Sequence, residues 1–225
     1  AHLFPPAIEI ECVTKEAESE NETSTNIALS FLPGVVMMAL FFAAQGMSED
    51  IWRERSQGIL RRLCSTPHSV VLFLFARCTA CAFLLLILSA IGLAIGMLYH
   101  GLPLTRLPMA ALWSALAGTM LLAMMLVFQL FARSQRAGSV LSNSVLFPLL
   151  MVGGSFFPLE SMPAGMAAGG RHTPNGWAIG VMADLMLGRG NAELLLTSLA
   201  ILVAVSVPLF LLAANRLRRG FASGA

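Results

Sequence analysis

Few residues in this sequence belong to the types that carry out chemistry in proteins, and one short spacing stands out among them. Cys78 and Cys81 form a C-x-x-C pair, a spacing found in metal sites and in redox-active disulfides. The pair lies inside the apolar run ARCTACAFLLLIL, and no second pair of ligands is near it in the sequence. A closed metal site needs about four ligands. We therefore interpret both cysteines as small side chains that pack between helices, and we predict no metal site.

The remaining candidates for catalysis are isolated from one another. The segment GGSFF around Ser155 lacks the second glycine of a G-x-S-x-G nucleophile turn. The single lysine, Lys15, stands in VTKEAE without the glycines of a phosphate-binding loop. The histidines fall in four separate connecting segments, as His2, His68, His100 and His172. We therefore predict no catalytic residue in this chain and exclude a P-loop ATPase.

The composition places the chain in a membrane. Of its 225 residues, 57% are hydrophobic and 12% are charged, about half the charged share of an average soluble domain. Five segments are apolar over the length of about 20 residues that a spanning helix needs. They cover residues 27–47, 69–99, 108–131, 137–157 and 194–215. These long runs without alternation predict an all-α integral membrane protein with five transmembrane helices, built from residues 27–225.

The positions of the arginines predict the orientation of these spans. Alternating spans place three basic segments on one side, with Arg53, Arg55, Arg61, Arg62, Arg133, Arg136, Arg216, Arg218 and Arg219. The positive-inside rule makes that side cytoplasmic, together with the C-terminus. The basic residues of the other side are Lys15, Arg106, Arg171 and Arg189. An acidic leader with six glutamates from Glu9 to Glu22 joins them, so we expect residues 1–26 to end an extracytoplasmic segment that follows an earlier span.

The first cytoplasmic connection, residues 49–68, has the pattern of an amphipathic helix. Its apolar residues recur at an imperfect helical spacing with arginines between them: Ile51, Trp52, Ile59, Leu60 and Leu63. Gly58 interrupts the pattern. Such a helix along the membrane is either a basic interfacial anchor or a docking element for a soluble partner. Arg77 follows near the start of the second span, and we expect its side chain to extend to the lipid headgroups.

The connection before the last span, residues 158–190, is too apolar for an ordinary loop and too rich in glycine and proline for a spanning helix. Short apolar pieces of this kind are expected in re-entrant or interfacial helices. Glycine and proline also punctuate ordinary loops, which is the alternative interpretation. Phe156, Phe157 and Trp177 favour contact with the membrane.

Polar side chains within the spans have two interpretations. They bond helices to one another, or, in the case of Gln129 and Asn143, they line a transport pathway. No Asp, Glu or Lys lies near the middle of a predicted span, which argues against an ion-coupled secondary transporter. That class stays as the alternative function, together with a regulatory membrane subunit that transports nothing.

Two motifs resemble those of a known family, the permease subunits of ATP-binding-cassette exporters with the type-2 membrane domain. That family has a cytoplasmic motif like E-R-x-x-G-T-L-E-R-L-x-x-T-P, and residues 54–67 read E-R-S-Q-G-I-L-R-R-L-C-S-T-P. It also has G-G-x-F-F-P-L-E-x-M-P before the last span, and residues 153–163 read G-G-S-F-F-P-L-E-S-M-P, followed by T-P-x-x-W at 173–177. The resemblance covers the chain from about residue 30 to its end. Ile59 and Arg61 replace a usual threonine and a usual glutamate. If that glutamate contacts the ATPase, Arg61 makes the contact different in charge or in partner.

The resemblance implies a permease that exports a hydrophobic or amphipathic substrate (drug-like, lipid-like or a glycoconjugate) across a bacterial inner membrane. It implies a second permease copy or paralogue and separate ATPase subunits that bind ATP and magnesium, while this chain holds no cofactor and no nucleic acid. The implied coupling residues are Glu54, Arg55, Gly58, Leu60, Arg61, Arg62, Leu63, Thr66 and Pro67. The implied re-entrant exit region contains Gly153, Gly154, Phe156, Phe157, Pro158, Glu160, Pro163, Pro174 and Trp177.

Overall fold

The computed structural model describes residues 9–64 and 70–221, and this part of the chain is helical without a β-strand. The main helices are α1 (Glu9–Ser56), α2 (Ile59–Cys64), α3 (Val70–Tyr99), α4 (Leu107–Phe131), α5 (Gln135–Val152), α6 (Ala164–Arg171), α7 (Pro174–Leu187) and α8 (Ala192–Arg216). Shorter helical turns are η1 (Leu104–Arg106), η2 (Leu159–Ser161) and the π-helical η3 (Leu217–Phe221). The predicted all-α class is confirmed.

Within the described residues, four helices are long and apolar enough to cross a membrane. These segments are Leu29–Ser56, Val71–Tyr99, Leu104–Phe131 and Glu193–Arg219. The predicted span at 137–157 is a helix, but α5 has 18 residues, begins with polar side chains and ends at Val152. It ends there because Gly154 takes a positive φ of 84°, a conformation that glycine adopts without strain. At about 27 Å, α5 alone is shorter than the hydrocarbon core, and the five-span count stays a prediction.

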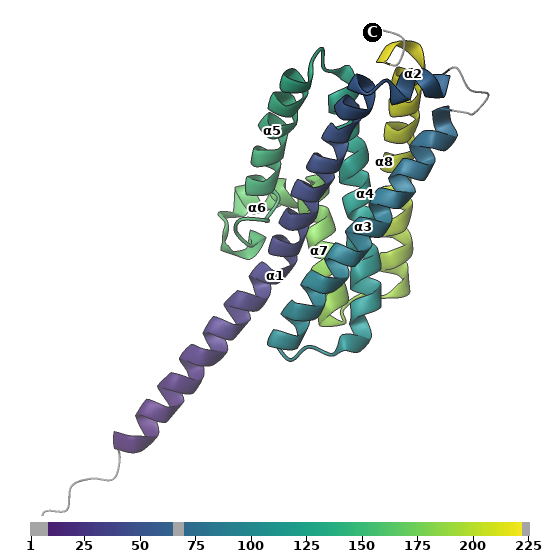
Figure 1. The fold of residues 1–225 in the computed structure, drawn as a ribbon. Helices are drawn as coiled ribbons and strands as arrows, with labels where there is room; N and C mark the ends of the chain where they lie inside the picture. The colour runs from purple at the N-terminus through teal and green to yellow at the C-terminus, as the bar shows by residue number, and fades with distance from the viewer. Residues whose placement is uncertain (1–8, 65–69, 222–225) are drawn as a thin grey trace, which may run out of the picture.

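Helix α4 is the centre of the bundle. Its most apolar stretch is 72% buried, against 28% for α3 and 11% for α8. The main core joins Met125 and other residues of α4 to residues of the five helices around it, which include Met37, Leu93, Leu150, Met182 and Leu202. The helices α1, α3, α5, α7 and α8 therefore pack around α4 (Figure 1). Most of the apolar surface of α3 and α8 is exposed.

The chain crosses the bundle between its two ends in three successive short helices, α5, α6 and α7, rather than in one long helix. In Figure 1, α5 runs from the end that carries α2 to about the middle of the bundle, α6 lies there, and α7 continues to the opposite end. Thr173 caps α7 by accepting a hydrogen bond from the N–H of Gly176 at 3.0 Å, and Pro174 occupies the first turn. Gly188 ends α7 with a φ of 74°. These local signals determine where α7 begins and ends.

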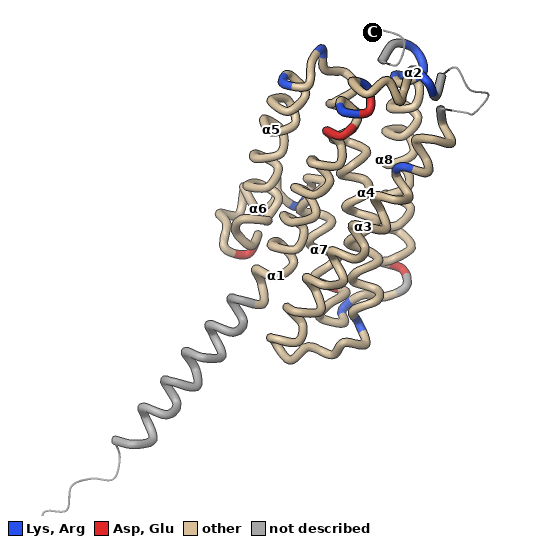
Figure 2. The backbone as a smooth tube through the Cα atoms, viewed as in Figure 1, with Lys and Arg blue, Asp and Glu red and all other residues tan. Residues whose placement is uncertain are grey.

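Most positive side chains lie at one end of the bundle, the end with α2 and the C-terminus (Figure 2). The end of α8 is joined to α4 there, because the Nε of Arg216 donates to the carbonyl of Leu130 at 3.4 Å and its guanidinium lies 5.1 Å from the ring of Phe131. The basic segments that the sequence placed on one side therefore gather at one end of the structure.

Candidate functional site

The residues predicted to couple to an ATPase form the last turns of α1, a glycine turn and α2. Helix α1 continues through Ser56, so the prediction of one separate helix over residues 49–68 is wrong in its first half. Helix α1 continues into this segment because Ile51 and Trp52 extend its buried face. Gly58 then reverses the chain with a φ of 69°.

Part of the predicted coupling motif lies outside the described residues. Thr66 and Pro67 are not described, and neither are the side chains of Arg61 and Leu63. Among the described residues in and beside the motif, some are buried and others are exposed, while Glu54, Arg55 and Gly58 are partly buried. This division defines the inner surface, the name used below for the exposed side of the last turn of α1, the Gly58 turn and α2.

The buried set fixes the inner surface to the spans. The side chain of Leu60 on α2 is 1% exposed and packs in one cluster with Ile51. The same cluster contains Leu74 of α3, Leu130 of α4 and Leu217 of η3. Leu60 therefore ties α2 to α3, α4 and η3, and a displacement of α2 would strain these contacts because the side chains are closely packed.

The exposed set is polar and positively charged. Arg53, Gln57 and Arg62 are exposed and do not belong to the Leu60 cluster. Arg55 is half-buried, and its guanidinium lies 5.5 Å from the ring centre of Trp52, a cation–π distance. An exposed surface with this charge favours contact with acidic groups.

An ion pair joins α1 to α3 beside this surface. Arg77 pairs with Glu54, and this is the single ion pair among the described side chains. The Nη2 of Arg77 also donates to the carbonyl of Met47 at 2.6 Å. The expectation that Arg77 extends to the headgroups is therefore wrong, because α1 supplies both a carboxylate and a carbonyl within its reach. The second carboxylate oxygen of Glu54 is buried without a hydrogen-bond partner.

The two predicted pathway residues form hydrogen bonds between helices. Gln129 on α4 is fully buried; its Oε1 accepts from the Nε1 of Trp52 at 2.9 Å, and its Nε2 donates to the hydroxyl of Ser142 at 3.0 Å. Asn143 accepts from the Nε2 of Gln45 at 2.7 Å. In this conformation the polar groups bind α1, α4 and α5 together, and a role in a pathway stays a prediction.

Glycines allow a close backbone approach in the predicted exit region. A Cβ on Gly34 of α1 would lie 2.7 Å from the carbonyl oxygen of Gly154, so only glycine lets α1 contact this turn. Asn175 is fully buried, donates from Nδ2 to the hydroxyl of Ser155 at 2.8 Å, and leaves its Oδ1 without a partner. The sequence analysis did not predict this pair. The available signal was the Asn-Gly that follows Thr-Pro in residues 173–176.

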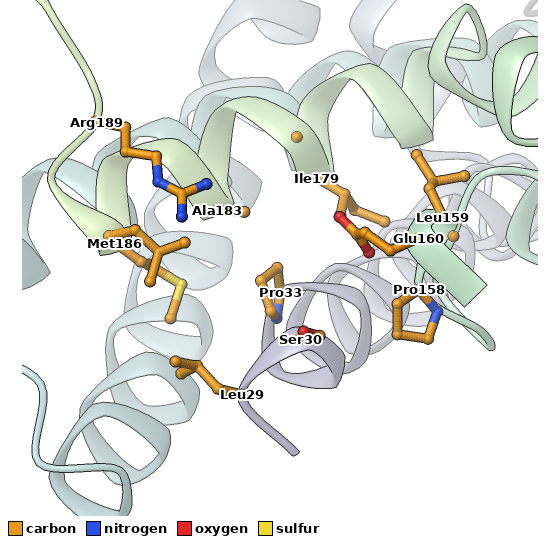
Figure 3. Close-up of a pocket in the computed structure, with 13 residues that line it drawn as sticks. Leu29, Ser30, Pro33, Pro158, Leu159, Glu160, Ile179, Ala183, Met186 and Arg189 are labelled. Atoms are coloured by element: carbon orange, nitrogen blue, oxygen red, sulfur yellow. The ribbon is translucent and has the colours of Figure 1, made fainter. Parts of the chain in front are cut away.

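A cavity of about 270 Å³ lies between α1, η2 and α7. Figure 3 shows the carboxylate of Glu160, beside Ile179, on one side of it and the guanidinium of Arg189 on another side. Three of the predicted exit residues line it: Gly154, Pro158 and Glu160.

Two of the other predicted exit residues line a second cavity, and the rest line neither one. Phe156, Phe157 and Pro163 are exposed. Trp177 and Pro174 line a second cavity beside α8, and Trp177 stacks edge-on against Trp113 at 5.3 Å between ring centres. The structure therefore does not bring the predicted exit residues together at one site.

A bundle of apolar helices with one basic end is the architecture of a membrane domain. Among the described residues, no group of three or more His, Cys, Asp or Glu side chains could hold a metal ion. The family model described as ABC-2 family transporter protein matches residues 6–215. The chain therefore belongs to the ABC-2 transporter family, as the two motifs predicted. It is a membrane component of an ABC transporter and is not itself a catalytic enzyme. No curated protein matches the sequence.

Proposed function

We propose that this chain is the permease subunit of an ATP-driven exporter, and that a separate ATPase subunit drives it through the inner surface. The family supports this function, because its members are membrane components of ABC transporters. The single lysine of the chain is not in a phosphate-binding loop, so ATP and magnesium belong on the partner. The observation that carries the proposal is the position of Leu60, which is buried among α3, α4 and η3 while Arg53 and Arg62 of the same segment are exposed.

Helix α1 is the element that connects the inner surface to the outer cavity. From Gly34, which contacts the turn at Gly154, to Ser56 it is one continuous helix of about 33 Å. The Glu54–Arg77 pair links it to α3 near its inner end. ATPase movement against the inner surface would tilt α1 and α3 together and change the cavity between α1, η2 and α7.

The direction and the cargo follow from the same proposal. The basic end faces the cytoplasm of a bacterial inner membrane, with the C-terminus on that side. Two permease copies, or one copy and a paralogue, enclose a path for a hydrophobic or amphipathic substrate. The cavity beside Glu160 and Arg189 then belongs to the outer, exit half of this path.

Co-purification tests the inner surface directly. The tagged permease is solubilised from its native host, and the ATPase that accompanies it is identified and its activity measured. The double variant Arg53→Glu, Arg62→Glu reverses two charges of the inner surface. The matched control, Arg133→Glu with Arg136→Glu, reverses two exposed charges in the α4–α5 segment at the same end. We expect the first variant to lose the ATPase and the control to retain it.

Two outcomes contradict the proposal. Equal loss of the ATPase in both double variants would mean that net charge, rather than the inner surface, holds the partner. A stable permease that recovers no ATPase in any form would leave this segment as an interfacial anchor.

A further inference from the structure

A positively charged group lies beside α8 at the junction of α6 and α7. Arg171 and His172 line a cavity of about 280 Å³ there, with Trp177 on α7 as a neighbour. The opposite wall is apolar and consists of Met120, Ile201 and Val205. This cavity is separate from the one that Glu160 and Arg189 line.

The cavity lies at the middle of the spanning helices. Met120 is 13 residues from the first residue of α4 and 11 from its last, and Val205 has the same spacing in α8. The sequence predicted that Arg171 lies at the outer side. The structure places it deeper because α7, 14 residues or about 21 Å long, occupies the outer half of the crossing that α5, α6 and α7 make. That distance is several times the length of an arginine side chain, so Arg171 does not extend to the outer headgroups.

The guanidinium of Arg171 lacks a partner in the described part of the chain. It takes part in no ion pair or hydrogen bond there, and no acidic residue lines the cavity. The Nδ1 of His172 donates to the carbonyl of Ala168 at 2.8 Å, which leaves Nε2 for another contact. A charge at mid-membrane is costly unless a counter-charge accompanies it. An anion from outside this chain would supply that counter-charge.

An apolar surface continues from this charge toward the outer end. A further cavity of about 150 Å³ lies between α4 and α8, lined by Leu112, Leu116 and Leu199 among other apolar residues. Trp113 lines this cavity and stacks against Trp177, which lines the cavity that contains Arg171. The charge of Arg171 is therefore followed by an apolar surface along α4 and α8.

We propose that the α6–α7 junction binds an anionic amphiphile. Its carboxylate or phosphate pairs with Arg171, and its hydrocarbon chain lies along α4 and α8. An inorganic anion alone does not fit the apolar walls. The binding itself is independent of the proposed function, and only the further statement that this molecule is exported cargo rests on it.

Tryptophan quenching measures this binding on the full permease, purified in detergent without an ATPase. The probe is a 16-carbon fatty acid brominated near its carboxyl end, which quenches Trp177 when bound. The uncharged alcohol with the same brominated chain is the headgroup control. Arg171→Gln removes the charge, and Arg189→Gln makes the same change at an arginine of the other cavity.

We expect saturable quenching by the acid and weak quenching by the alcohol in the parent protein. Because a charge-assisted hydrogen bond is lost, Arg171→Gln should raise the Kd of the acid on the order of tenfold. Arg189→Gln should leave that Kd unchanged. Competition by unlabelled phosphatidate against unlabelled fatty acid then distinguishes a lipid phosphate from a carboxylate as the preferred headgroup.

Several results would overturn the inference. Equal affinity of Arg171→Gln and the parent would do so, as would full competition by inorganic phosphate, which has no chain. A changed oligomeric state of Arg171→Gln with unaltered acid binding would assign the counter-charge to a partner subunit. If Arg171→Gln does not fold, Ile201→Phe fills the cavity from α8 and should abolish saturable quenching. A permease that binds the acid but recovers no ATPase would keep this inference and remove the exporter proposal.

Discussion

Arg77 on α3 pairs with Glu54 on α1, two residues before α1 ends. The pair joins the motif segment after the first predicted span to the second span. Its two side chains are 11% and 23% exposed, so most of the surface of each is removed from solvent or lipid. The ends of α1 and α3 are therefore held together at the inner surface by charge as well as by the Leu60 cluster.

Removal of one member of this pair should destabilise the permease. Glu54→Gln leaves the guanidinium of Arg77 partly buried without its counter-charge, and we expect a loss of about 1–3 kcal/mol in the free energy of unfolding. Thermal unfolding in detergent measures it. Arg53→Gln, a change to an exposed side chain on the same helix, should stay within about 0.5 kcal/mol of the parent. The charge exchange Glu54→Arg with Arg77→Glu should regain part of the loss, and an equal effect of the Glu54 and Arg53 variants would contradict the assignment.

Two serines on α5 should respond differently to the same substitution. The hydroxyl of Ser142 accepts from the fully buried Gln129 at 3.0 Å, whereas that of exposed Ser144 donates to the carbonyl of Val140 within its own helix. Ser142→Ala leaves a buried amide N–H unpaired and should cost about 1 kcal/mol of unfolding free energy. Ser144→Ala should cost almost nothing. Identical melting temperatures of the two variants would mean that the α4–α5 hydrogen bond contributes no stability.

Arg106 should stabilise the outer end of α7. Its Nη1 donates to the carbonyl of Met186 at 3.1 Å, in the last turn of that helix. A cation at a helix C-terminus contributes about 0.3–1 kcal/mol, so Arg106→Gln should increase hydrogen exchange of the amides in the last turn of α7. Arg189→Gln, which alters a neighbouring arginine without a described side-chain bond, is the control. No change in exchange with Arg106→Gln would refute the capping role.

The sequence alone predicted what depends on local pattern. Apolar runs predicted the four helices that qualify as spans, and Gly58 marked a real turn between two helices. The predicted span at 137–157 ran past Gly154, where the structure ends α5. The two motifs predicted the family. Each of the confirmed features is determined by neighbours within a few turns of the chain, which is why a single sequence is enough to find it.

The contacts between helices were not predictable in the same way. The sequence predicted that Arg77 extends to the headgroups and that Arg171 lies on the outer side. Instead, the position of Glu54 determines the contacts of Arg77, and the depth of α6 determines those of Arg171. Asn175 and Ser155 are 20 residues apart and meet only after α5 ends and α6 turns back. Such pairings depend on packing between helices, and no spacing along the chain encodes them.

Glycine at position 34 should be required for the contact between α1 and the outer turn. In Gly34→Ala the new methyl would lie 2.7 Å from the carbonyl oxygen of Gly154 and 3.0 Å from that of Ser155, and neither is the end of a flexible side chain. Backbone must therefore move, at a cost of about 1–3 kcal/mol in unfolding free energy. Gly46→Ala, on the same helix with no atom within 4 Å of the new methyl, is the matched control. Because alanine favours helix, it should stabilise the permease by about 0.5–1 kcal/mol.

The two glycine variants also test the role of α1 as the connecting element. If α1 carries movement from the inner surface to the outer cavity, Gly34→Ala should retain the ATPase in co-purification while it lowers export, since it disturbs only the outer contact. Gly46→Ala should retain both. Loss of ATPase binding in Gly34→Ala would show that its effect is general unfolding. Full export by Gly34→Ala despite a lower melting temperature would show that the contact with Gly154 stabilises the fold but does not transmit movement.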